Sequence, residues 1–582
     1  ETAYLLIECK KPGTSPKAKK DGIEQLKSYM AACANATYGL WTNGDDRFCF
    51  AKRTTSGGKI VFEEIIEILA AGQTEADAQR PRRKDLKAAT AANLLYAFRR
   101  CHNYIAGTEG MQKPQAFWEL LKLIFCKIED ERSRELSFFV TPTELGSATT
   151  GAPAKARMQK ILTQKVVKKY PTIFSTPETQ TIELRPNTLA YVVSQLQSFS
   201  LLASPVDVKG VAYEEVVGSN LRGDRGEFFT PRNACRMAIA MLNPQPDEGL
   251  LDPACGTGGF LITAMNHALD LIEQGEKLQW GDPALPTDYE RDELYRKRAD
   301  YLTRCVFGLD LNPDLVRAAK MNMVMNNDGS GGLFQANSLA NPHIWDPAAA
   351  QALPLGSIEV LCTNPPFGAN IVIDDEDLLG QYELAAMWDQ TPNGRWEKRA
   401  DGSGKAVLQK SQPPEILFIE RCLQFLRPGT GRMAMVIPNG ILNNPALGYI
   451  REWLLANAQI LAVVDMARDL FQPKNDTQTS MVLMRRLDET EKTAAKAGEL
   501  DYSCFMAVTD KVGHDKRGNP VYRRTETGED VVVVRKEAVT EHDPHTGQDT
   551  VTEIEVKELL LDDELPEVAE AYIRWLTTSG QG

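Results

Sequence analysis

The sequence has no run of apolar residues long enough to span a bilayer, and no secretory signal opens it. These absences argue against a membrane partner and favour a cytoplasmic protein. Hydrophobic residues make up 43% of the chain and charged residues 25%, as in ordinary globular proteins. At 582 residues, the chain is long enough for several domains. It begins at Glu1, inside a predicted strand, so we expect further residues upstream.

Paired cysteines are also missing. The eleven cysteines are scattered without a CxxC pair, and the six histidines do not cluster near them. Metal sites and disulfide frameworks need such clusters, so we predict no metal and no disulfides. Free thiols agree with a reducing compartment.

The chain has no excess of basic residues. It carries 66 Lys and Arg against 79 Asp and Glu, a formal net charge of -13. A protein that grips nucleic acid by itself usually has a basic surface. The net charge does not exclude a local basic cleft. However, the acidity indicates that a partner contributes part of any nucleic-acid binding.

The pattern along the chain divides it into four parts. Residues 1–75 are predicted to form a small α/β unit, and residues 85–215 a helical domain. Residues 216–490 alternate short apolar strands with helices. A polar insert at 370–412 interrupts this pattern, and we expect it to be a surface loop near the edge of the sheet that carries the active site. Residues 491–582 are charged and irregular, with a strand-like segment and a closing helix that we expect to dock a partner.

Alternating strands and helices predict an α/β fold with a mostly parallel sheet covered on both faces. Ligands of such sheets bind beyond the carboxyl ends of the strands. Seven segments are predicted to be its strands: "GLLDP", "CVFGLDL", "GLFQAN", "IEVLCTN", "GRMAMVIP", "ILAVVDM" and "TSMVLMRR".

A glycine-rich turn follows the first of these strands, in "LLDPACGTGGFLITA". Glycines there let the backbone approach a ligand closely before the helix begins. The turn lacks the GxxxxGK[ST] pattern of a P-loop, but it suits a phosphate, a dinucleotide or S-adenosylmethionine. We place Asp252, Gly256, Thr257 and Gly258 in this cofactor site, with Asp252 facing the amino-acid part of the ligand; the alternative for Asp252 is a turn-stabilising role.

The next two strands supply two further candidates. Asp310, at the tip of "FGLDL", can accept hydrogen bonds from both hydroxyls of a ribose. Asn337, after the third strand, can contact an adenine ring, or it is a plain loop asparagine.

The fourth strand leads into "TNPPFG". Pro365 and Pro366 stiffen the backbone after Asn364, so that the Asn364 side-chain oxygen and the Pro365 carbonyl can accept from one NH2 group. Two acceptors would draw an exocyclic amine such as adenine N6 toward tetrahedral geometry and release its lone pair. Phe367 offers a ring on which an extruded base can stack. An ordinary Asn-Pro-Pro turn beside a core Phe is the alternative, which the ordered motifs upstream disfavour.

Together "DPACGTGG" and "NPPF" resemble an amino-group methyltransferase. "RGEFFTPR", upstream of the glycine turn, resembles the segment that packs against the cofactor in modification subunits of type I restriction–modification systems. The motif order is that of the gamma group of N6-adenine DNA methyltransferases. This resemblance implies a Rossmann-like, seven-stranded methyltransferase core that uses S-adenosyl-L-methionine. It also implies that the cofactor pocket is lined by Glu227, Phe228, Phe229, Thr230 and Pro231.

The resemblance covers roughly residues 110–530, and the chain departs from it in two places. Asn337 stands where many relatives have an acidic residue, and the 370–412 insert is additional. No extended target-recognition domain is evident after the NPPF loop, and we expect a separate specificity subunit. Double-stranded DNA and a restriction subunit are the other expected partners.

The N-terminal "IECKKP" places Glu8 and Lys10 on the same face of a strand, and Gln25 follows in "EQLKSYM". With an upstream Asp, this is the metal and water site of a restriction nuclease fold. The stretch resembles the N-terminal nuclease-like domain of type I restriction subunits. Since the matching Asp is not seen, Mg²⁺ binding would be weak, and we expect a structural or DNA-docking remnant.

The leading hypothesis is an adenine-N6 DNA methyltransferase of a restriction–modification or phage-defence system. It needs no covalent intermediate, so Cys255 and Cys362 are interpreted as apolar fillers. The alternatives are a non-catalytic DNA-bound scaffold, a methyltransferase–nuclease fusion and a protein glutamine methyltransferase.

Overall fold

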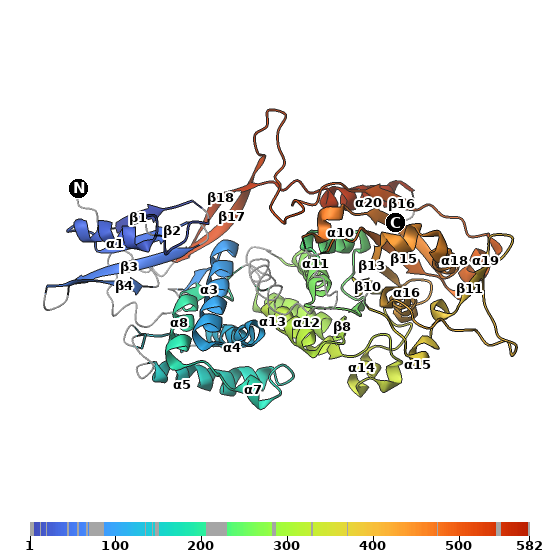
Figure 1. The fold of residues 1–582 in the computed structure, drawn as a ribbon, viewed down its shortest axis with the longest axis horizontal. Coiled ribbons are helices and arrows are strands. Elements are labelled where there is room, and N and C mark those ends of the chain that lie inside the picture. The colour runs from blue at the N-terminus through green and yellow to red at the C-terminus, as the bar shows by residue number, and fades with distance from the viewer. Residues whose placement is uncertain are drawn as a thin grey trace. The chain divides into compact units, whose positions relative to one another are not determined.

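The computed structural model divides the chain into two compact units, Glu1–Asn220 (unit 1) and Leu221–Gly582 (unit 2) (Figure 1). The structure describes residues 5–11, 13–18, 20–43, 46–54, 58–65, 68, 86–133, 136–141, 144–145, 151–204, 213, 230–281, 287–326, 330–368, 371–473, 475–542 and 549–579. Among these residues, no helix is long and apolar enough to cross a membrane.

Unit 1 opens with a four-stranded sheet in the order β1-β2-β3-β4, in which β1 and β2 are parallel and the other pairs antiparallel. Leu26 and Met30, on a helix that packs on this sheet, share a small core with Trp41 and Phe50. The predicted strand, helix and strand of this segment are present. The elements are β1 Leu5–Cys9, α1 Ile23–Ala32, β2 Tyr38–Thr42, β3 Arg47–Thr54 and β4 Ile60–Ile65.

The rest of unit 1 is helical, as the spacing of apolar residues predicts. Its central helix, α4, is buried along almost its whole length, because apolar side chains occupy several faces and its buried charged side chains form ion pairs, some within the helix and some with other segments. Lys127, for example, forms an ion pair with Glu131 at 3.3 Å. The elements are β5 Lys87–Ala88, α3 Ala91–Glu109, α4 Lys113–Glu131, α5 Ala152–Ile161, a π-helical turn Leu162–Val166, α6 Val167–Lys169, α7 Pro177–Gln180, α8 Pro186–Leu196 and β6 Phe199–Ser200.

Unit 2 contains an eight-stranded sheet in the order β16-β14-β15-β13-β10-β7-β8-β9. All neighbouring pairs are parallel except those of β15, which runs antiparallel to β13 and β14. Each of the seven predicted strands is present, and β16 adds an eighth from beyond the predicted core. The strands are β7 Leu250–Asp252, β8 Val306–Asp310, β9 Leu333–Gln335, β10 Val360–Thr363, β13 Arg432–Pro438, β14 Ala458–Asp465, β15 Thr479–Arg486 and β16 Phe505–Val508.

Helices cover both faces of this sheet. Side chains alternate along each strand, so that Val360 and Cys362 of β10 join one core cluster and Leu361 joins the other. The first cluster includes residues of α10 Arg232–Leu242, α11 Gly259–Lys277, α12 Asp288–Arg304, α13 Pro313–Met325 and α20 Leu565–Ser579. The second includes residues of α14 Pro347–Ala352, α15 Glu376–Leu379, α16 Pro414–Phe425, α17 Asn439–Asn443 and α18 Gly448–Asn457.

The insert is not the simple surface loop that its polar composition predicts. It contains α15 and the hairpin of β11 Trp388–Gln390 and β12 Trp396–Lys398. Tyr382, Leu384 and Ala385 are buried in the second cluster, because apolar residues dispersed among polar ones face the helices of the core. The insert is therefore a folded layer of unit 2.

The C-terminal region also returns to the core. Leu565, Ala569 and Tyr572 of α20 are buried in the first cluster, and α20 packs on α10 and β16. The apolar face of the closing helix is thus covered within the chain. The remaining elements are α19 Glu489–Ala497 and the hairpin of β17 Val532–His542 and β18 Asp549–Leu559.

Candidate active site

The predicted motifs of unit 2 meet at one edge of the sheet. The strand β7 lies between β8 and β10, with Asp252 beside Gly308 and Leu251 beside Leu361. Because the three strands are parallel, their carboxyl ends, which carry the glycine turn, Asp310 and the NPPF loop, lie side by side.

The glycine turn has the backbone geometry that its sequence predicts. Gly256 and Gly258 have φ values of +53° and +85°, which side chains rarely adopt, and α11 begins directly afterwards. A Cβ atom on Gly256 would meet no described atom within 4 Å. The turn therefore faces open space that a ligand can approach. Thr257 is buried, and its carbonyl accepts from Asn322 Nδ2 at 3.0 Å.

Asp310 holds this turn against the end of β8. Its Oδ2 accepts from the Gly256 N–H at 3.0 Å and its Oδ1 from the Asn312 N–H at 2.8 Å. The carboxylate and the open space beside Gly256 fit the ribose of a nucleoside cofactor.

Asp252 links the glycine turn to the NPPF loop. Its side chain is 2% exposed, and Oδ1 accepts from Thr363 Oγ1 at 2.8 Å and from the Ala254 N–H at 3.1 Å. Burial raises the pKa of Asp252 to about 7, although the Thr363 hydrogen bond opposes the rise. Since Thr363 precedes Asn364, this bond fixes the start of the NPPF loop relative to the turn.

Within the NPPF loop, Asn364 is partly exposed, Pro365 is buried and Pro366 is partly exposed. Phe367 is only 3% exposed and packs edge-to-face on Phe471, with ring centroids 6.4 Å apart. In this conformation, the Phe367 ring belongs to the core cluster, and stacking on a base would require the loop to move. Sequence reasoning missed Phe471, whose signal was an aromatic residue just after a predicted strand.

Sequence reasoning also missed Glu415, in the first turn of α16. Its carboxylate accepts from its own N–H and from the N–H of Gly368, the residue after Phe367. Burial raises the pKa of Glu415 to about 7. Its Oε2 is buried and has no hydrogen-bond partner in the described part of the chain. The only signal was a Pro-Pro-Glu start to a predicted helix.

The side chain of Asn337 is engaged in its own turn. Its Oδ1 accepts from the Leu339 N–H at 3.1 Å, and its carbonyl accepts from Trp345 Nε1 at 2.9 Å. These two bonds do not depend on a ligand. A contact between Asn337 and the adenine ring of the cofactor therefore remains a prediction.

The segment upstream of the turn is described only in part. Glu227, Phe228 and Phe229 lie outside the described residues, so their predicted roles stay predictions. Thr230 is partly exposed, and Pro231 is the N-cap of α10.

In unit 1, the structure brings the three remnant residues together. Lys10 Nζ lies 2.7 Å from Glu8 Oε1, 3.0 Å from Gln25 Oε1 and 3.0 Å from Asp21 Oδ1. Hydrogen bonding to Glu8, and then to Asp21, raises the pKa of Lys10. Sequence reasoning missed Asp21. Over the described residues, no group of three or more His, Cys, Asp or Glu side chains could hold a metal ion.

Two family descriptions match this sequence. Residues 205–499 match "N-6 DNA Methylase", and residues 1–68 match "Type I restriction enzyme R protein N terminus". The first match covers just over half of the chain and includes the glycine turn, Asp310 and the NPPF loop.

Individual relatives are more distant. The chain is 26% identical over 272 residues to the Type I restriction enzyme EcoKI methylase subunit of Escherichia coli, covering 45% of this chain and 41% of that protein. It is 25% identical over 296 residues to the MjaVII methylase subunit of Methanocaldococcus jannaschii, covering 50% and 42%. The chain thus spans less than half of these curated relatives. A solved type I restriction–modification methyltransferase subunit from Streptococcus thermophilus is 17% identical, covers 71% of this chain and 95% of that one, and has a TM-score of 0.42.

Proposed function

Because the chain belongs to the N-6 DNA methylase family, we propose that it transfers a methyl group from S-adenosylmethionine to adenine N6 in DNA, within a restriction–modification system. The observation that carries the proposal is the Thr363–Asp252 hydrogen bond of 2.8 Å, which joins the NPPF loop to the glycine turn. In the proposal, one structural unit would thereby hold both the methyl donor and the amine.

Each residue at the sheet edge has its own role in the proposed reaction. Asp310 would accept hydrogen bonds from the ribose of the cofactor, and Gly256 would let the ligand approach the turn. When bound, the cofactor supplies a methyl group on a positively charged sulfur. Asn364 Oδ1 and the Pro365 carbonyl would accept the two hydrogens of the adenine amine and orient its lone pair. The chain's main contribution is alignment, because attack on such a methyl group needs little else.

Further subunits complete the proposal. The formal net charge of -13 favours a partner that helps to hold the DNA. The curated relatives are named as subunits of restriction enzymes. We therefore include double-stranded DNA, a separate specificity subunit and a restriction subunit as partners.

The test replaces Asn364 with alanine. The Asn364→Ala chain, assembled with its proposed partner subunits, should lose methylation while S-adenosylmethionine binding changes little. Transfer of labelled methyl to DNA and equilibrium dialysis of the cofactor measure the two properties. The matched control is Asn393→Ala, at an exposed hairpin turn. Near-normal methylation by Asn364→Ala would refute the assignment of the loop.

Two alternatives give different results in the same assay. Labelled methyl on protein instead of DNA would indicate a glutamine methyltransferase. Cofactor binding without transfer to DNA, even from the wild-type assembly, would indicate a scaffold.

A second activity is favoured by one observation in unit 1. Glu8, Lys10 and Gln25 converge there as in a nuclease site, within a segment that matches a restriction-protein N terminus. Mg²⁺-dependent DNA cleavage by the full-length protein, lost in Lys10→Ala, would identify a methyltransferase–nuclease fusion. If wild-type protein does not cleave, the cluster is a remnant.

A further inference from the structure

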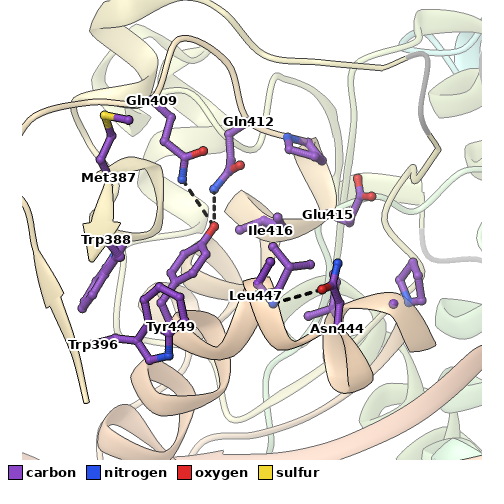
Figure 2. Close-up of a pocket in the computed structure, with 15 residues that line it drawn as sticks. Met387, Trp388, Trp396, Gln409, Gln412, Glu415, Ile416, Asn444, Leu447 and Tyr449 are labelled. Atoms are coloured by element: carbon purple, nitrogen blue, oxygen red, sulfur yellow. Dashed lines mark hydrogen bonds between the residues drawn. The ribbon is translucent and has the colours of Figure 1, made fainter. Parts of the chain in front are cut away.

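Unit 2 contains a pocket of about 460 Å³ that the site described above leaves unused. This volume is within the range of small-molecule sites. The insert forms one wall, and α16, α17, α18 and the end of β13 form the others. Figure 2 shows Met387, Trp388 and Trp396 on one side and Glu415 and Asn444 on the other. The lining residues are Met387, Trp388, Trp396, Gln409, Gln412, Pro413, Glu415, Ile416, Pro438, Gly440, Ile441, Asn444, Ala446, Leu447 and Tyr449.

The aromatic wall of the pocket is held in place. Trp388 stacks on Tyr449, with ring centroids 5.8 Å apart, and Trp396 meets the same ring at 5.9 Å. The Tyr449 hydroxyl accepts from Gln412 Nε2 at 3.0 Å and from Gln409 Nε2 at 3.4 Å (Figure 2). A fixed aromatic wall suits a flat ring, since a flat ring loses little freedom on stacking.

The polar groups of the pocket narrow the class of ligand. Among the described residues that line it there is no lysine, arginine or histidine, so the lining offers no cation to pair with a phosphate. The one carboxyl group in the lining is Glu415, whose buried Oε2 has no hydrogen-bond partner in the described part of the chain. A buried acceptor without a donor is costly, and a ligand N–H would remove that cost.

The pocket adjoins the NPPF loop. Glu415 accepts from the N–H of Gly368, directly after Phe367. Pro438 lies at the carboxyl end of β13, which pairs with β10. A group bound in the pocket would therefore lie at the same sheet edge as the proposed methyl transfer.

We propose that this pocket holds an unstacked nucleobase with an exocyclic amine, its ring against the Trp388 and Trp396 wall and its amine donating to Glu415. This inference rests on the proposed function, because DNA at the NPPF loop is what brings a base within reach. The base is a neighbouring nucleotide of the same DNA, because both hydrogens of the methylated adenine's amine are already assigned to Asn364 and Pro365.

The first experiment tests the pocket in the full chain without DNA. The probes are 2′-deoxycytidine and its analogue without the 4-amino group, with binding followed by tryptophan fluorescence. Wild-type protein should bind deoxycytidine about tenfold more tightly than the analogue, the value of one hydrogen bond to a charged group. Glu415→Gln should remove this preference, because its amide nitrogen cannot accept from the amine, while its oxygen can still accept from Gly368.

Two further variants separate the pocket from general damage to the fold. Trp388→Leu should weaken both nucleosides about tenfold by removing a stacking surface. Glu397→Gln is the matched control for Glu415→Gln; Glu397 is exposed and adjacent to Trp396 on β12, and its replacement should leave binding unchanged. The proposal is overturned if wild type shows no preference for the amine, or if Glu415→Gln retains it.

The second experiment identifies the source of the base in the assembled complex on DNA. The DNA affinity lost in Trp388→Leu is measured on duplexes that lack one base, either the methylated adenine or one of its neighbours. The loss should vanish when one particular neighbour is absent, and that neighbour is then the base held in the pocket. If the loss persists on every duplex, if it vanishes only without the methylated adenine, or if Trp388→Leu costs no affinity, the proposal fails. Because nucleoside binding needs no turnover, a chain that binds deoxycytidine but methylates nothing would refute only the proposed reaction.

Discussion

Replacing Asp252 with asparagine should make stability less dependent on pH. Burial raises the pKa of this carboxyl group from 3.8 to about 7 in the folded protein. Between these values, the folded protein holds a proton that the unfolded chain has released. Stability therefore falls as the pH rises through this window, and the penalty is complete above pH 7.

The magnitude follows from the same two values. A difference between 3.8 and about 7 corresponds to roughly 4 kcal/mol lost between pH 4 and pH 8. The substituted asparagine would carry no charge, and its amide oxygen can still accept from Thr363 and from the Ala254 N–H. The new NH2 group must find an acceptor, so the absolute stability at one pH is less informative than the change between two.

The assay is denaturant unfolding of both proteins at pH 5 and at pH 8. Relative to wild type, Asp252→Asn should gain about 1–4 kcal/mol of unfolding free energy between pH 5 and pH 8. Asp374→Asn, at an exposed position of the insert, should show no such gain. An Asp252→Asn effect that is equal at the two pH values would refute the claim that this buried carboxyl group carries the penalty.

Three smaller predictions concern other positions. In Gly308→Ala, the new Cβ would lie 2.6 Å from Leu333 Cδ2. Thermal unfolding should therefore show that the free energy of unfolding falls by about 1–3 kcal/mol. The control is Gly275→Ala in α11, whose new Cβ meets no atom within 4 Å and should not lower that free energy. Asp310→Ala should weaken S-adenosylmethionine binding, measured by dialysis, more than it lowers the stability of the fold. Unchanged affinity would exclude Asp310 from the cofactor site. Lys10→Ala should lower the midpoint of thermal unfolding, because the Lys10 and Glu8 side chains are only 14% and 17% exposed and Glu8 would lose its partner; an unchanged midpoint would show that this ion pair does not stabilise the fold.

Most strands of the sheet could be predicted, because each strand has a recognisable local sequence pattern. Strands such as β7 and β10 are short apolar runs followed by turn residues, and parallel pairing then brings their ends to one edge. The positions of Asp252, Asp310 and Asn364 at that edge follow from this rule alone.

The features that sequence reasoning missed depend on contacts between distant segments. Phe471 matters because it meets Phe367, and Glu415 because it meets Gly368. The strand β16 is short and becomes a strand only by pairing with β14. In the insert, polar composition concealed the few apolar residues that anchor it. Pairings of this kind have no local pattern.

In the proposed reaction, the hydrogen bonds at the sheet edge would hold the methyl-donor site and the amine site in fixed positions. Transfer between two ligands needs alignment within about half an ångström, which a flexible loop cannot hold. Asp310 fixes the glycine turn to β8, and Asp252 fixes the same turn to Thr363 at the start of the NPPF loop. Burying Asp252 lowers stability at neutral pH, yet it sets the distance between the two loops before either ligand binds. On this reasoning, the raised pKa of Asp252 is a consequence of holding the two loops in register.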